Sequence, residues 1–132
     1  MIRTLSLFAI APALIASHPA PGMQRDVIVG RDGPNLDACS SVGRVTNLKP
    51  GGDNFLSVRA APDTRAVEKD RLKADEMVAM CDEAGDWIGV VYRPPEGTET
   101  CGTGTPSAYL GAYRGPCRYG WVHGDYIELI AG

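Results

Sequence analysis

Four cysteines, Cys39, Cys81, Cys101 and Cys117, are the residues of this chain best suited to covalent chemistry. In an exported domain, an even number of cysteines predicts a framework of two disulfide bonds. Three pairings are possible. We favour Cys101–Cys117 because both residues lie in one stretch rich in glycine and proline, and this leaves Cys39–Cys81. In the chain-entropy model, the two loop closures contribute about 3 and about 4 kcal/mol, respectively.

A metal site formed by Cys101, Cys117 and His123 is the competing interpretation of these cysteines. Its spacing matches no standard zinc pattern, and an exported protein normally oxidises such thiols. We therefore expect neither a metal nor another cofactor.

Catalytic chemistry has little support in the sequence. His123 precedes Asp125 by two positions, but the available serines, such as Ser57 and Ser107, lack the spacing of a nucleophile elbow. Paired cysteines leave no thiolate nucleophile, and Gly102-Thr103-Gly104 lacks the lysine of a phosphate-binding loop. We therefore expect a binding or structural protein and not an enzyme.

Residues 1–20 have the pattern of a secretory signal peptide. Arg3 precedes an apolar run from Leu5 to Ala16, and small residues follow it. That run of 12 residues is too short to cross a hydrocarbon core of about 30 Å at about 1.5 Å per residue. A buried N-terminal helix is the alternative. The signal interpretation predicts a periplasmic or secreted protein that is not inserted in the membrane after cleavage.

The mature chain divides into two parts. Residues 21–38 are interrupted by proline and glycine, so we expect a flexible N-terminal segment, followed by one folded domain over residues 39–132. The net charge is −3 and the pI is about 5.3. Because no basic cluster accompanies this acidic balance, nucleic acid and anionic membrane surfaces are poor partners.

Short strands separated by turns are expected through most of this domain. The run Asn54–Pro62 alternates in polarity and ends at a proline, and Trp87–Tyr92 is a second apolar strand. Residues 64–80 are rich in helix formers but present no broad apolar stripe. We therefore favour a loop through residues 63–75, then a strand over residues 77–81.

A stretch of 25 residues, Arg93–Cys117, separates the strand Trp87–Tyr92 from the next one, which begins at Arg118. Its prolines exclude a regular helix or a central strand over most of its length. Loops this long are commonly functional or disordered, and the expected Cys101–Cys117 bond argues against disorder.

Four short motifs occur in an order that resembles bacterial Src-homology-3 (SH3b) domains. They are Leu56-Ser57-Val58-Arg59, Trp87-x-x-Val90, Gly120-Trp121-Val122 and Tyr126-Ile127, and together they span about residues 45–130. The resemblance implies an all-β fold, a small SH3-like barrel that here carries a long disulfide-linked loop insertion. It also implies a binding module of the cell envelope that recognises peptidoglycan or a peptide or protein ligand.

The sequence leaves the ligand open: the partner is a cell-wall glycopeptide or an envelope protein. The alternative function is an inhibitor or adaptor that binds an envelope enzyme through the Cys101–Cys117 loop. For the ligand-binding residues we nominate Tyr109, Tyr113 and Arg114 of this loop, together with Trp87, because tyrosine, tryptophan and arginine are enriched at binding hot spots. Packing of the same tyrosines against the barrel is the competing interpretation.

Export with removal of the signal peptide is directly testable. We expect the protein recovered from envelope fractions to lack about the first 20 residues, because the short apolar run followed by small residues is the pattern that signal peptidases recognise. Intact-mass spectrometry checks this, and a mass that still includes Met1 would contradict it.

Overall fold

The computed structural model describes residues 6–13 and 23–132 and shows an all-β protein. Most of the predicted signal peptide, residues 1–20, therefore lies outside the described residues. Within the described part, no helix is long and apolar enough to cross a membrane. The elements are β1 (Ile28–Val29), β2 (Ser41–Val45), β3 (Leu56–Arg59), β4 (Glu68–Leu72), β5 (Met77–Ala84), β6 (Trp87–Tyr92), β7 (Gly111–Ala112), β8 (Arg118–His123), the 3-10 turn η1 (Gly124–Tyr126) and β9 (Ile127–Ala131).

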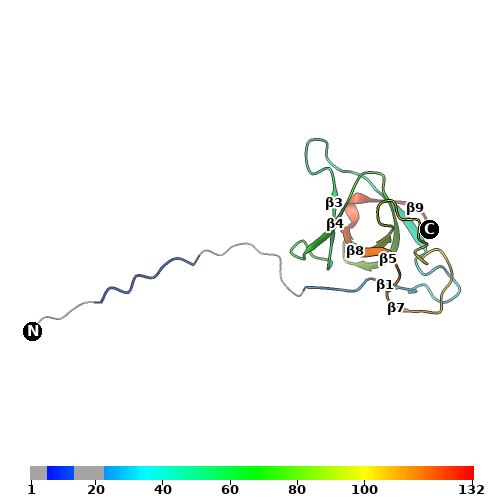
Figure 1. Cartoon of the computed structure of the whole chain (residues 1–132), viewed down its shortest axis with the longest axis horizontal. Helices are drawn as coiled ribbons and strands as arrows, with labels where there is room; N and C mark the ends of the chain where they lie inside the picture. Colours follow the sequence, from blue (N-terminus) through cyan, green and yellow to red (C-terminus); the bar gives the residue numbers. More distant parts are fainter. Residues whose placement is uncertain (1–5, 14–22) are drawn as a thin grey trace, which may run out of the picture.

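Seven strands form one curved antiparallel sheet in the order β4-β3-β8-β6-β5-β2-β9 (Figure 1). Its two edge strands, β4 and β9, are not paired with each other in the described part of the chain, so the sheet is not closed into the barrel that the sequence led us to expect. The chain turns back at β4 to form a hairpin with β3, and β9 pairs only with β2. Each edge is therefore left with one partner.

Strand β4 corrects the expected loop over residues 63–75. Four of its five residues are charged, which makes it a poor strand by propensity, but it pairs antiparallel with β3, with one register shift between Val58 and Arg59. Side-chain contacts offset this poor preference: Ser57 of β3 donates to Glu68 across the strand pair, and within β4 Glu68 forms an ion pair with Arg71 at 2.6 Å. The strand predicted over residues 77–81 is confirmed, and it extends to Ala84.

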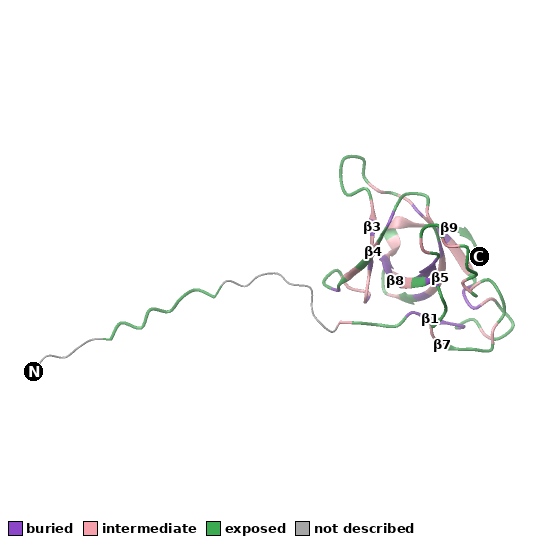
Figure 2. Cartoon of the chain, in the orientation of Figure 1, coloured by how far each residue is buried: buried purple, intermediate pink, exposed green. Residues whose placement is uncertain are grey.

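The sheet buries apolar side chains on both of its faces, and Figure 2 shows the buried residues of its strands in purple. Successive residues of a strand point to opposite faces, yet Val90 and Val91 are both buried, as are Trp121 and Val122. One cluster, which we call the inner core, is formed by Val45, Leu56, Val58, Leu72, Val78, Val90, Tyr92 and Val122. The other, the outer core, is formed by Val27, Val29, Ala38, Cys39, Val91, Tyr113, Cys117 and Trp121.

Two segments that precede and interrupt the sheet cover the outer core. We expected residues 21–38 to be flexible, but Val27 and Val29 are buried and β1 pairs with β7 of the long insertion. The ordered domain therefore begins near Arg25 and not at Cys39, because these valines have a second apolar face on which to pack. Both predicted disulfides are formed, Cys39–Cys81 and Cys101–Cys117.

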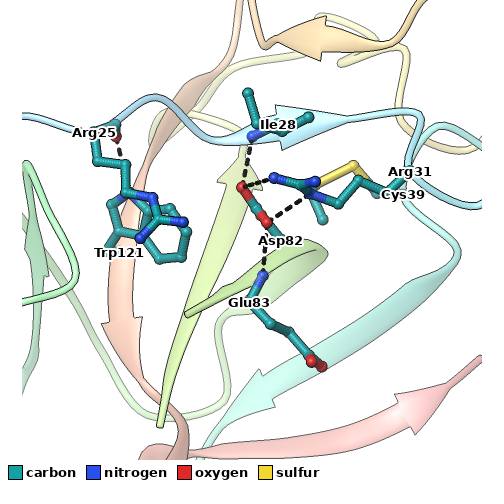
Figure 3. Close-up of polar contacts among 8 residues, drawn as sticks. Arg25, Ile28, Arg31, Cys39, Asp82, Glu83 and Trp121 are labelled. Carbon is teal, nitrogen blue, oxygen red and sulfur yellow. Dashed lines mark hydrogen bonds and ion pairs between the residues drawn. A yellow bond between two sulfur atoms is a disulfide. The ribbon is translucent and has the colours of Figure 1, made fainter. Parts of the chain in front are cut away.

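Asp82 fixes the N-terminal segment to the sheet (Figure 3). Its side chain is 1% exposed. The carboxylate accepts hydrogen bonds from the backbone N–H groups of Ile28 and Glu83 and from the guanidinium of Arg31, at 3.0, 2.9 and 2.8 Å. A buried carboxylate is tolerated only when it is paired in this way. The nearby Cys39–Cys81 bond holds the same two parts of the chain together covalently.

Replacing Asp82 with alanine should lower the free energy of unfolding by about 3 kcal/mol, because it leaves buried donors of the N-terminal segment without an acceptor. Equilibrium denaturation in urea measures this loss. The matched control is Glu83→Ala, whose side chain is exposed on the same strand and should change stability by less than about 0.5 kcal/mol. Equal losses in the two variants would show that Asp82 does not anchor the segment.

Candidate functional site

A mostly polar hollow of about 580 Å³ lies around Asp82. A smaller groove of about 480 Å³, which we call the aromatic groove, is lined by several aromatic side chains. It runs between the β2–β3 loop, the exposed face of β3, and the end of β8 with η1. Its aromatic lining residues are Phe55, Trp87, His123 and Tyr126. These residues come from distant parts of the chain, and the sheet brings them together because β6 and β8 pair Trp87 with His123 in register.

His123 contacts two of the other aromatic residues that line the groove. Its ring meets Trp87 edge to face at 5.4 Å between centroids and meets Tyr126 at 6.2 Å. Its Nδ1 accepts the backbone N–H of Asp125 at 3.2 Å, which caps η1. In the neutral ring this bond places the proton on Nε2. Nε2 makes no hydrogen bond within the described residues, so it remains available as a donor.

Charged side chains make several contacts on the β3 side of the groove. The Arg71 guanidinium lies 3.9 Å from the centroid of Phe55, a cation–π contact. Hydrogen bonds from Ser57 and then Arg71 lower the pKa of Glu68, so this carboxylate stays ionised in weak acid. Arg59 donates to the carbonyl of Ala66 at 3.0 Å. These contacts fix the groove wall before any ligand arrives.

A further, smaller hollow of about 300 Å³, the loop cavity, lies between the N-terminal segment and the insertion. Three of the four predicted binding residues line it, namely Tyr109, Tyr113 and Arg114. The fourth, Trp87, lies in the aromatic groove instead. The structure therefore divides the nominated set between two sites that share no lining residue.

The two tyrosines of the insertion have different environments. Tyr113 is 8% exposed; its hydroxyl donates to the carbonyl of Cys101 at 2.9 Å and accepts the N–H of Cys117 at 3.3 Å. It is therefore a packing residue that also forms the cavity floor. Tyr109 is 46% exposed, and its hydroxyl donates to the carbonyl of Ala112 at 2.7 Å. This bond holds its ring at the cavity mouth.

Sequence reasoning missed Phe55, His123 and Tyr126 as groove residues. A signal for Phe55 was present, because it alternates with Leu56 and Val58 and so shares the non-core face of β3 with Ser57. No comparable signal places His123 beside Trp87, since that contact depends on the pairing of β6 with β8.

Tyr92, Asp70 and Arg118 form a cluster of titratable groups with a structural role. Burial, together with Asp70, raises the pKa of Tyr92, so the phenol stays protonated and donates to the Asp70 carboxylate at 2.8 Å. Arg118 completes this cluster with an ion pair to Asp70 at 3.1 Å. Among the described residues, no three histidine, cysteine or acidic side chains are grouped so that they could hold a metal ion.

Comparison of the chain with protein-family models, with curated proteins and with solved structures found no significant match.

Removing the hydroxyl of Tyr113 should destabilise the domain. Tyr113→Phe leaves the partly buried carbonyl of Cys101 and the buried N–H of Cys117 without their partner, so we expect a loss of about 1–2 kcal/mol in the free energy of unfolding. Tyr109→Phe is the matched control, because the hydroxyl that it removes lies at the surface, where water replaces it. A larger loss in the Tyr109 variant would reverse this assignment.

Proposed function

We propose that this chain is a binding module that works outside the cytoplasm and takes an extended peptide segment in the aromatic groove. The observation that carries the proposal is the convergence of Phe55, Trp87, His123 and Tyr126 on one groove of about 480 Å³. Aromatic-lined grooves bind extended peptides because flat rings pack against apolar side chains while nearby polar groups meet the peptide backbone.

The polar groups of the groove suit a peptide backbone. The Nε2 proton of His123 is a donor for a carbonyl, and the Asp125 carboxylate, 78% exposed, is an acceptor for an N–H or an ammonium group. Lys49 and Asp53, in the β2–β3 loop, also line the groove and carry charges of opposite sign. A mixed lining of this kind favours a zwitterionic or polar peptide over a strongly charged polymer.

The compartment in which the protein works limits which peptides it can meet. Two disulfides in a small domain fit an oxidising compartment outside the cytoplasm. There the stem peptide of the cell-wall glycopeptide and the exposed segments of envelope proteins share the required chemistry. The SH3b resemblance supports the same class of function, because Trp87 and Tyr126 belong to the motifs that carry it.

A pull-down with the oxidised protein tests the proposal. Purified cell-wall sacculi form one arm and solubilised envelope proteins form the other. We expect retention in at least one arm, and the double variant Phe55→Ala/Trp87→Ala should weaken it at least about tenfold, since aromatic hot-spot residues commonly contribute 2 kcal/mol or more.

The matched control for this experiment is Tyr109→Ala, which removes an exposed aromatic ring outside the groove. Thermal melting of each variant shows that the fold is retained. Retention that survives the double groove variant but is lost in the control would place binding on the insertion and support the inhibitor or adaptor alternative. Lack of retention in both arms would contradict a peptide-binding role.

A further inference from the structure

We infer that the loop cavity is a second binding site, which takes a small organic acid with a flat apolar body. This inference is independent of the proposed function, because the cavity and the aromatic groove share no residue. The cavity combines an apolar floor, an exposed aromatic ring at its mouth and a positive charge beside it.

The floor of the loop cavity is apolar and firmly held. Val29 and Ala38 contribute side chains that are 5% and 6% exposed, and Tyr113 adds its ring. Backbone hydrogen bonds join the N-terminal segment to the insertion at two places around this floor. Strand β1 pairs with β7, and the backbone N–H of Ala38 donates to the carbonyl of Thr105 at 3.0 Å. A cavity bounded in this way is preformed, so a ligand would pay little to order it.

The mouth of the cavity offers an aromatic surface in a fixed position. Tyr109 is anchored at its hydroxyl by Ala112 and at its backbone N–H by the Ser107 hydroxyl, at 2.7 and 3.1 Å. Its ring nevertheless remains 46% exposed. An oriented but exposed aromatic ring favours a flat apolar partner that can stack against it.

The charge at the cavity determines the class of ligand. Arg114 is the one charged side chain among the cavity-lining residues, and it forms no ion pair with any described residue. This contrasts with the chain as a whole, whose net charge is −3. A guanidinium without a partner recognises a carboxylate through paired N–H groups. The combination therefore selects an apolar acid over a neutral or cationic molecule.

The test uses 1-naphthoate as the probe and 1-naphthalenemethanol as its uncharged counterpart. Each is titrated into the oxidised, exported protein, and binding is followed by amide chemical shifts in two-dimensional NMR. We expect 1-naphthoate to bind with a Kd on the order of 1 mM or tighter, as suits a ligand of this size. The shifts should be confined to the residues around the cavity, in the N-terminal segment and the insertion.

Variants separate the two parts of the recognition. Tyr109→Ala should weaken both probes about tenfold. Tyr109→Phe keeps the ring and the bond from its backbone N–H to Ser107, so it should change binding less than threefold. Arg114→Gln should weaken 1-naphthoate about fivefold and leave 1-naphthalenemethanol unchanged. Arg93→Gln removes an exposed charge elsewhere on the same insertion and should have no effect. Phe55→Ala in the aromatic groove should have none either.

The following outcomes would contradict the proposed site or the proposed class of ligand. Because Arg114 is exposed, its variant should fold even if Tyr109→Ala does not. Shifts that map to the aromatic groove, or no saturable shifts up to 10 mM probe (a limit chosen as about ten times the expected Kd), would overturn the site. Equal binding of the two probes, or insensitivity of 1-naphthoate to Arg114→Gln, would overturn the assignment to an acid.

Discussion

Burial of Trp121 on the outer face of the sheet is the constraint on which the rest of the structure depends. Its side chain is 0% exposed, while the next residue, Val122, is buried on the opposite face. Many antiparallel sheets pack one face on the core and leave the other in water. This sheet carries apolar side chains on both faces, so both faces must be covered. Gly89, opposite Trp121 in register, leaves room for the indole and for Val27. The indole N–H donates to the carbonyl of Arg25 at 2.9 Å, so the cover also satisfies the polar atom that it buries.

The cover of the outer core consists of the N-terminal segment and the insertion, and it has little regular structure of its own. It is therefore held by disulfides and an ion pair. Strands β1 and β7 have two residues each, which is far too short for independent stability. One disulfide ties the N-terminal segment to β5, and the other closes the insertion on itself. The ion pair between Asp82 and Arg31 adds a second link between the N-terminal segment and β5. Covalent closure lowers the entropy of the unfolded chain, which is what a layer with few backbone hydrogen bonds requires.

The sequence predicted the elements whose signals are local. Strands β3 and β6 combine alternating or continuous apolar residues with clear turn signals. The cysteine positions favoured one of three possible pairings, and the structure forms that pairing. Strand β4 was missed because its residues are charged, and it forms only through its pairing with β3. The N-terminal segment was misjudged because its few valines gain a reason to order only when the sheet offers Trp121. The predicted closure of the sheet into a barrel was also wrong, because closure depends on whether the distant strands β4 and β9 pair with each other.

The reach of the cover explains where the aromatic groove begins. Along the outer face of β8, Trp121 is 0% exposed under the cover, whereas the His123 side chain, two residues further on, is 30% exposed. The same face of β6 passes from Val91, 1% exposed, to the partly exposed Trp87. One row of side chains is therefore core at one end and groove lining at the other. No property of Trp87 or Trp121 alone distinguishes these roles, since each is an aromatic residue in an apolar strand. The difference arises because the covering segment crosses the sheet at Arg25–Val29 and leaves the ends of β6 and β8 open.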